Sequence, residues 1–477
     1  MPDELIGLTA IALDAHIRSG DVTPTEAVGA AIKRITETEP VVNALTTRCF
    51  ERALAQAKTL EETVRRGGQW PPLAGIPFVV KDNVDVGHVR TSGGSLLLGD
   101  RTPPRSDRPI AHLEENGGIP IAKSNLSELG GANTTNSIFG ATRNPWDPRL
   151  TAGGSSGGSA AALASGQVWL AHGNDVGGSL RTPASFCGVV GLRPTFGRVA
   201  RRAMSDAFDT IFVDGPMARN VADAAFMLDA MTGADPIDPL SMPSPADAFL
   251  DAARKPAPPQ RIAISPDLGC VPVGGAVRRA FDAFTSRLSV ETSRIDERTP
   301  DFKDFWRHAL AIRGASYVAN WGAFWPQSAA HFTKDVQSDI RRGLSQSGQA
   351  LAEAQRARAD LYRRVILFFR SYDVLICPTA PVQPFPVEEP WPRIIDDQKL
   401  ESYVDWIAIT YLWSMTGCPV LTVPVGFAED GLPFGVQIVG PPRSEHALLR
   451  TGAWIEGVFG RMTTPHLHEF ASDAPHA

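Results

Sequence analysis

Two serines in glycine-rich surroundings and one lysine after an apolar stretch are the residues of this chain that could do chemistry together. Residues 153–158 read GGSSGG and contain Ser155, and Ser179 follows a second glycine pair. Because glycine adopts backbone conformations that other residues reach only at a cost, such loops can present hydroxyl and N–H groups to a ligand. A serine hydroxyl is a poor nucleophile until a base removes its proton. The stretch 151–196 therefore predicts a nucleophile site or a ligand-binding loop.

Two common uses of glycine-rich loops fit this stretch poorly. Residues 153–157, GGSSG, match the GxSxG nucleophile elbow of α/β-hydrolases, but that elbow should follow a strong strand. Here residues 144–150, NPWDPRL, precede it and are typical of a loop. The Walker pattern GxxxxGK[ST] is absent, and no GxGxxG spacing falls between a strand and a helix. Neither a hydrolase elbow nor a nucleotide-binding loop is therefore expected.

Several motifs, in order along the chain, resemble the amidase signature family. The matching segments are residues 75–83 (GIPFVVKDN), 124–128, 153–162, 173–198, 214–219 and 432–440. The similarity covers most of the chain and is weakest from about 235 to 382. Several long motifs in one order are far more specific than a single glycine-rich match.

The resemblance implies a Ser–cisSer–Lys triad. By motif, Ser179 is the nucleophile, Ser155 is the bridging serine and Lys81 is the base. The family also places a cis peptide bond before the bridging serine, here between Gly154 and Ser155. Taken singly, the serines could instead cap helices and the lysine could lie on the surface.

The same resemblance implies an oxyanion hole in the loop that leads to the nucleophile. Its donors would be the backbone N–H groups of Val176, Gly177, Gly178 and Ser179. The glycines leave room for the developing oxyanion because they lack a Cβ atom. We expect Asp175, Arg181 and Gly154 to shape the surrounding loops without reacting.

A lysine can act as the base only when its amine is neutral. The pKa of a free lysine is about 10.4, and burial lowers it because burial disfavours the charged form. Lys81 follows the apolar residues 76–80, which favours burial, whereas Asp82 and Asp85 would oppose a lowered pKa. The neutral amine could take a proton from the bridging serine, which would take one from the nucleophile. The reverse transfer would protonate the leaving amine.

The elements that must position these residues follow from hydrophobic periodicity and end signals. We expect strands at residues 76–80, 119–122, 261–265, 374–378, 420–425 and 434–439, with the last two paired. Helices are expected at residues 50–64 and 220–231. Another helix should begin at Thr23, with a capping box to Glu26, and should end before Pro40.

Strands that alternate with helices predict an α/β fold, with a mixed central β-sheet flanked by helices on both faces. We expect one amidase-type domain over residues 1–477, with its core at about 60–230 and 400–460. A variable, helical, aromatic-rich region at about 235–390 should lie on the substrate side. Within it, residues 235–260 are rich in proline, aspartate and serine and predict a surface connection.

Composition argues against several classes of protein. The chain is 43% hydrophobic and 21% charged, and it contains no apolar run long enough to span a membrane. A net charge of −6 without strong blocks argues against nucleic-acid and membrane partners. The five cysteines and ten histidines show no metal-ligand spacing, so we expect neither a metal nor a cofactor. With no secretory signal at its start, the chain is expected in the cytoplasm, as a monomer or homodimer.

The substrate follows less directly. Aromatic residues crowd the middle and end of the chain: Phe302, Phe305, Trp306, Tyr317, Trp321, Phe324, Trp325, Phe385, Trp391, Trp406 and Trp413. Most should be core, but some should line a pocket, because small-molecule sites are mainly apolar. We therefore expect a small, uncharged, hydrophobic or aryl amide, with carbamates and esters as further candidates.

Two alternatives remain open. One is the glutaminase-type subunit of a tRNA-dependent amidotransferase, and the other is a catalytically silent binding protein of the same fold. The glutaminase subunit usually carries an aspartate where this chain has Ile407, although Asp405 lies two positions earlier.

Overall fold

One large mixed sheet runs through the whole protein. The computed structural model describes residues 2–201, 206–465 and 467, and within them eleven strands form this sheet. In spatial order they are β1 (Leu45–Arg48), β3 (Ile119–Ser124), β2 (Pro77–Lys81), β8 (Leu170–Asp175), β10 (Val213–Ala218), β9 (Val190–Arg193), β16 (Val420–Phe427), β17 (Pro433–Val439), β13 (Val374–Pro378), β11 (Ile262–Ile264) and β12 (Ile295–Glu297). Parallel and antiparallel neighbours both occur, and helices cover both faces, which confirms the expected fold class.

The two strands that carry the reactive segments are parallel neighbours. β2 pairs with β8 in the register Phe78↔Leu170 and Val80↔His172. Every residue of both strands is buried. Because parallel strands end at the same edge of a sheet, the segments that follow Lys81 and Asp175 meet there.

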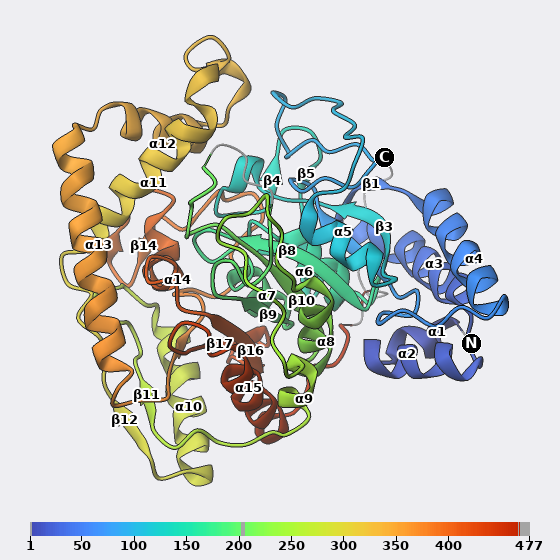
Figure 1. The fold of residues 1–477 in the computed structure, drawn as a ribbon. Coiled ribbons are helices and arrows are strands. Elements are labelled where there is room, and N and C mark those ends of the chain that lie inside the picture. Colours follow the sequence, from blue (N-terminus) through green and yellow to red (C-terminus); the bar gives the residue numbers. More distant parts are fainter. Residues whose placement is uncertain (1, 202–205, 466, 468–477) are drawn as a thin grey trace.

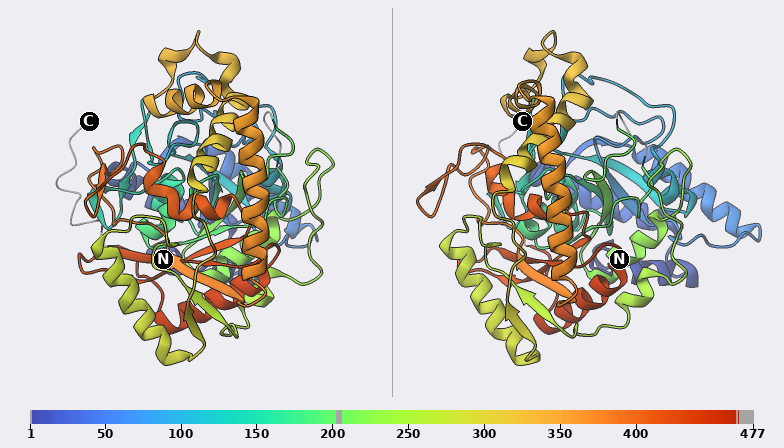
Figure 2. Two further views of the ribbon diagram at one scale, coloured as in Figure 1. Left: turned by 90° about the vertical axis from the view of Figure 1, so that its left-hand side faces the viewer. Right: turned by 60° about the vertical axis from the view of Figure 1, so that its left-hand side comes forward.

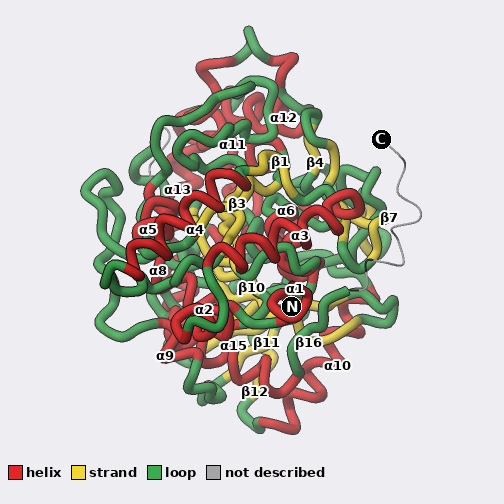
Figure 3. The backbone as a smooth tube through the Cα atoms, turned by 90° about the vertical axis from the view of Figure 1, so that its right-hand side faces the viewer, coloured by secondary structure: helices red, strands yellow, loops and turns green. Residues whose placement is uncertain are grey.

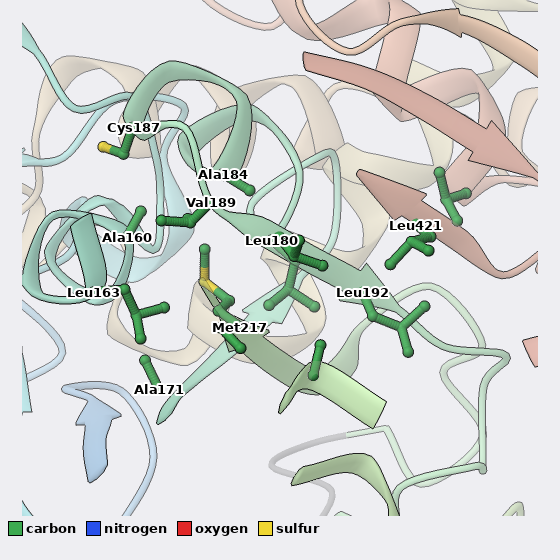
Figure 4. Close-up of a cluster of buried hydrophobic side chains, with 14 of the residues drawn as sticks. Ala160, Leu163, Ala171, Leu180, Ala184, Cys187, Val189, Leu192, Met217 and Leu421 are labelled. Carbon is green, nitrogen blue, oxygen red and sulfur yellow. The ribbon is translucent and has the colours of Figure 1, made fainter. Parts of the chain in front are cut away.

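The helices that follow the two serine segments are short and fully buried. α6 (Gly157–Ala164) consists of glycine, serine, alanine and leucine, and a Cβ on Gly158 would lie 2.4 Å from the backbone oxygen of Ala44. α7 (Thr182–Cys187) begins with a proline in its first turn. Leu163, Ala184 and Met217 meet in one buried cluster beside the central strands (Figure 4). Small residues thus let both serine segments press against the sheet.

The N-terminal helices cover one face of the sheet (Figure 3). They are α1 (Pro2–Gly7), α2 (Ala10–Ser19), α3 (Pro24–Val42), α4 (Phe50–Arg65) and α5 (Arg108–Glu115). The capping box between Thr23 and Glu26 is present, as expected. The predicted end before Pro40 is wrong, because α3 continues to Val42 with Pro40 inside it. Proline is tolerated there because its ring removes only the bond to the carbonyl of Thr36, and Thr36 and Pro40 both lie on the exposed side of the helix.

Residues 235–390 contribute to the same sheet as the rest of the chain. They supply β11, β12 and β13 as well as α9 (Phe249–Ala253), α10 (Gly275–Glu291), α11 (Trp306–Trp321), α12 (Lys334–Leu344) and α13 (Gly348–Phe368). α11, α12 and α13 stand together on the side opposite to α1–α4 (Figures 1 and 2). The helical, aromatic-rich region is therefore built onto the sheet through its own strands.

The remaining elements are mostly short. They are α8 (Val221–Met231), α14 (Ala408–Ser414), α15 (Glu445–Phe459), β4 (Thr135–Asn136), β5 (Gly140–Ala141), β6 (Arg143–Asn144), β7 (Asp147–Thr151), β14 (Ile394–Ile395), β15 (Gln398–Lys399) and the 3₁₀ turns η1 (Glu128–Gly130), η2 (Gly322–Phe324), η3 (Ala329–His331) and η4 (Asp405–Ile407). The loop expected at 144–150 is in fact mostly a small hairpin of β6 and β7. No helix in the described part of the chain is both long and apolar enough to cross a bilayer.

Candidate active site

Lys81 lies at the end of β2 with its side chain fully buried. Its Nζ is 2.7 Å from Ser155 Oγ, 2.7 Å from Asn174 Oδ1 and 3.3 Å from the backbone oxygen of Asn174. The two oxygens of Asn174 can only accept hydrogen bonds, whereas the serine hydroxyl can also donate one. A neutral amine has two N–H groups and one lone pair. The arrangement therefore suits an amine that donates twice to Asn174 and accepts a proton from Ser155.

Burial lowers the pKa of Lys81 from its ordinary value of 10.5 to about 7, although Asp175 and Asp214 act to raise it. The two aspartates that follow Lys81 in sequence, and were expected to oppose this shift, are engaged with other cations. Asp82 Oδ1 lies 3.0 Å from Lys123 Nζ, and Asp85 pairs with Arg101. Lys123, fully buried itself, thus balances the charge of Asp82.

The two serine segments meet at this lysine. The peptide bond between Gly154 and Ser155 is cis, as expected. The backbone N–H of Ser156 donates to the backbone oxygen of Ser179 at 3.3 Å, which ties one segment to the other. Ser155 and Ser179 line the same cavity. The structure therefore places Ser155 and Ser179 on the lining of one cavity, with Lys81 hydrogen-bonded to Ser155.

The backbone N–H groups of the loop before Ser179 differ in whether they have an acceptor within the protein. The N–H of Gly178 donates to Asp175 Oδ1 at 2.9 Å, so this predicted oxyanion donor already has an acceptor. Within residues 2–201, 206–465 and 467, no protein acceptor is present for the N–H groups of Val176, Gly177 and Ser179. We therefore reduce the predicted set of four donors to these three.

Gly178 instead has a steric role, because it allows a close approach between the loop and Thr410. Its φ angle is +129°, and a Cβ there would lie 2.2 Å from Thr410 Oγ1. The same Thr410 hydroxyl donates to the backbone oxygen of Gly177 at 2.6 Å. A glycine is therefore required for the loop to pack against α14.

A buried charge cluster underlies the loop. Asp175 accepts from the guanidinium groups of Arg181 and Arg193 and from the N–H of Leu180. Burial alone would raise the pKa of Asp175, but the two arginines outweigh it and hold the pKa below its usual range. Arg181 also donates to the backbone oxygen of Thr410 at 2.8 Å. Asp175 and Arg181 thus lie where they can fix the loop, as expected.

Sequence reasoning missed two residues that support the site. Asn174 contacts Lys81 and is itself held by its Nδ2, which donates to Asn83 Oδ1 at 2.8 Å. Arg193 completes the ion pair with Asp175 from a strand eighteen residues later. Both lie inside matched segments, but nothing in their spacing indicates that they converge on the site.

The cavity measures about 530 Å³ and has an aromatic wall. One stripe of α11 and the turn after it faces the cavity, formed by Arg313, Ser316, Tyr317, Asn320, Trp321 and Phe324. Phe212 and Tyr411 add two aromatic rings that were not expected there. The other expected aromatics do not line it, and Phe302, Phe305, Trp406 and Trp413 are core residues.

Asp405, the alternative match to the glutaminase aspartate, does not line the cavity. Its carboxylate accepts from Trp306 Nε1 at 2.9 Å and from the N–H groups of Glu401 and Ser402. These bonds hold the start of η4. Among the described residues, no group of three or more His, Cys, Asp or Glu side chains could hold a metal ion.

Comparison with known proteins agrees with this geometry. The family model described as Amidase matches residues 26–449. The chain is 34% identical to a glutamyl-tRNA(Gln) amidotransferase subunit of Chloroflexus aurantiacus, over 94% of this chain and 96% of that protein. It is 32% identical to an acylamidase of Rhodococcus erythropolis, over 94% and 95% of the two chains. The structure of a bacterial aryl acylamidase of the amidase signature enzymes superposes with a TM-score of 0.87 at 25% identity, over 94% of this chain and 96% of the other. The chain therefore belongs to the amidase family, that of the amidase signature enzymes.

Proposed function

We propose that this protein hydrolyses the C–N bond of small, uncharged, hydrophobic or aryl amides through an acyl-enzyme on Ser179. One observation carries the proposal: a fully buried lysine amine lies 2.7 Å from the hydroxyl of Ser155, at the end of an aromatic cavity that also contains Ser179. With a pKa of about 7, the Lys81 amine is neutral in about half of the molecules at neutral pH.

In the acylation step, Ser179 Oγ attacks the amide carbon while its proton passes to Ser155 Oγ. The hydroxyl proton of Ser155 passes in turn to the neutral amine of Lys81. The N–H groups of Val176, Gly177 and Ser179 would stabilise the tetrahedral oxyanion, and each such donor contributes about 10²–10³-fold in rate. General base catalysis adds about 10²–10⁴-fold.

Collapse of the intermediate breaks the C–N bond. The leaving nitrogen needs a proton, because an amide anion leaves very poorly. The proton returns from Lys81 through Ser155, so the same relay serves as base and then as acid. Water then attacks the acyl-enzyme by the same route and releases the acid. Asn174 keeps the lysine amine aimed at Ser155 in both half-reactions.

The aromatic wall supports the substrate class. Tyr317, Trp321, Phe324 and Tyr411 provide flat apolar surfaces that suit an aryl or alkyl group. The similarity to an acylamidase and an aryl acylamidase fits this class. Carbamates and esters form similar tetrahedral intermediates and would share the site.

The glutaminase-type function is the second candidate, because a glutamyl-tRNA(Gln) amidotransferase subunit is among the relatives. The aspartate that the glutaminase subunit would use for the α-amino group has no match in the cavity, since Asp405 does not line it and bonds Trp306 and two backbone N–H groups. We therefore rank this function below the acylamidase function and propose that the chain acts without a partner protein.

The test is turnover by the purified chain of acetanilides, aliphatic amides, glutamine, aryl carbamates and p-nitrophenyl esters. Ser179→Ala should abolish turnover. Ser159→Ala is the matched control, since this buried serine of the same segment bonds Ser124 and His172 and does not line the cavity. Equal turnover by wild type and Ser179→Ala would overturn the nucleophile. Turnover of glutamine alone would favour the second candidate.

A further inference from the structure

Arg313 places a buried cation in the wall of the cavity. It belongs to α11, is 3% exposed, and lies one helical turn from Tyr317 on the stripe that faces the cavity. The proposed chemistry does not use it. A guanidinium in an apolar wall is costly unless its N–H groups have acceptors.

The partners of this guanidinium are almost complete. Its Nε donates to Asp339 Oδ2 at 2.8 Å, and its Nη2 donates to the hydroxyls of Tyr317 at 2.9 Å and Tyr403 at 2.5 Å. Burial would lower the pKa of Arg313, but Asp339 outweighs this effect and raises the pKa well above its usual value. The side chain is therefore charged at any working pH.

The Nη1 atom of Arg313 differs from the other two nitrogens. It carries two N–H groups, and among the described residues only the Tyr411 hydroxyl remains to interact with this guanidinium, which can occupy only one of them. Asp339 makes no bond to Nη1, and its oxygens accept instead from Arg313 Nε, Arg342 and the hydroxyl of Tyr403. Nη1 is thus a charged donor left over on a cavity-lining side chain.

This donor lies close to the reacting loop. The Cζ atom of Arg313 is 5.7 Å from the ring centroid of Tyr411. Tyr411 in turn packs on the oxyanion loop, since a Cβ on Gly177 would lie 3.2 Å from its Cδ2. A single aromatic ring therefore separates the guanidinium from the loop that would hold the scissile carbonyl.

We propose that Arg313 Nη1 anchors an acceptor oxygen of the substrate, so that the natural amide carries a second carbonyl or a carboxylate beside the amide that is cleaved. This inference rests on the proposed function of the same cavity and specifies its substrate. Asp339 is shared between Arg313 and Arg342, so both a neutral and an anionic acceptor oxygen suit Nη1. An apolar substrate without such an oxygen leaves a buried charged donor unpaired, which costs affinity.

The test compares substrates that differ only in the acceptor. On the amine side these are acetanilides with a para acetyl, carboxylate or isopropyl group. On the acyl side they are the anilides of 4-oxopentanoic, succinic and 4-methylpentanoic acid. We expect the wild type to prefer an acceptor-bearing member of at least one trio by about 10–100-fold in kcat/KM, as hydrogen bonds to charged groups give. The acetyl and carboxylate arms show whether the oxygen is neutral or anionic.

Arg313→Lys should reduce this preference at least tenfold, because a lysine that pairs with Asp339 has no second fork nitrogen for the substrate. Arg342→Lys is the matched control. It perturbs the same Asp339 but does not line the cavity, so it should keep the preference. A preference that is absent from wild type, or equal in Arg313→Lys, overturns the proposal.

Two further measurements test the proposal if Arg313→Lys does not fold or if the wild type shows no turnover. If Arg313→Lys does not fold, the double variant Arg313→Gln, Asp339→Asn replaces it, since that pair leaves neither charge buried alone. Calorimetric binding of the same trios to Ser179→Ala needs no turnover. Absence of turnover in wild type would contradict the proposed function, while Kd values that depend on the acceptor and on Arg313 would still support the anchor. Kd values that do not depend on Arg313 would overturn it.

Discussion

Replacing Lys81 by methionine should stabilise the protein below neutral pH while it abolishes amide turnover. The fall in the pKa of Lys81 from 10.5 to about 7 corresponds to about 5 kcal/mol of free energy against the charged form in the folded state. Methionine fills a similar volume without a charge. The Asn174 oxygen and the Ser155 hydroxyl would lose a partner, at about 1–3 kcal/mol. The net gain at pH 6 should therefore be about 2–4 kcal/mol.

The difference in unfolding free energy between Lys81→Met and wild type should depend on pH. Below pH 7 the lysine is charged in both the folded and the unfolded chain, so the folded wild type carries the full cost of burial. Between pH 7 and 10.5 the unfolded chain binds one proton more than the folded chain, so wild-type stability rises with pH. The advantage of Lys81→Met should therefore shrink by about 3 kcal/mol between pH 6 and pH 9.

Urea titrations of wild type and variant at pH 6 and pH 9 measure this difference. Lys123→Met is the matched control, because Lys123 is equally buried but is paired with Asp82 at 3.0 Å. Its loss leaves the buried carboxylate of Asp82 without a cationic partner and should destabilise the fold by about 3–5 kcal/mol. If Lys81→Met destabilises the protein to the same extent as Lys123→Met at pH 6, the buried Lys81 ammonium does not destabilise the folded wild type, and the prediction is wrong.

The remaining predictions concern activity. For an anilide substrate, kcat/KM should fall about tenfold per pH unit below about pH 7, because protonated Lys81 cannot accept a proton; a flat profile from pH 5 to 8 would contradict this. Asn174→Asp should move this acid limb to higher pH, because a carboxylate 2.7 Å from the amine favours the ammonium; an unmoved limb would exclude direct contact. Gly178→Ala should inactivate the enzyme, since the new Cβ would lie 2.2 Å from Thr410 Oγ1, and retained kcat would show that the loop adapts. Arg181→Lys should lower kcat more than it changes KM, because it loosens the loop and leaves the cavity wall intact; steady-state kinetics would show the reverse if Arg181 only shaped the pocket.

The local elements of this fold were largely predictable. Periodicity and capping signals placed the β2 strand, the α4 and α8 helices and the β16–β17 pair within a few residues. These segments are decided by their own apolar pattern. The order of the eleven strands could not be derived in that way, because strands that pair side by side, such as β9 and β16, lie more than two hundred residues apart. The resemblance to a family supplied the architecture that periodicity could not.

The motifs identified the residues that we propose to react, whereas the residues that hold them in place were harder to predict. The motifs named Lys81, Ser155 and Ser179, and the structure places all three together. Side-chain contacts such as Asn174 on Lys81 depend on how two strand ends are aligned, and a single sequence does not specify this. Gly178 shows the same limit, since its motif position suggested an oxyanion donor and only the geometry shows Asp175 on its N–H.

The low pKa of Lys81 is a property of the whole charge arrangement around it. Two aspartates follow close behind it in sequence, and either of them, left free, would hold the amine charged. Lys123 takes Asp82, and Arg101 takes Asp85, so both negative charges are balanced outside the triad. On the other side, Arg181 and Arg193 balance Asp175. The burial of Lys81 can then dominate, and a lysine near four carboxylates in sequence or space, Asp214 included, has a pKa of about 7, which the proposed base requires.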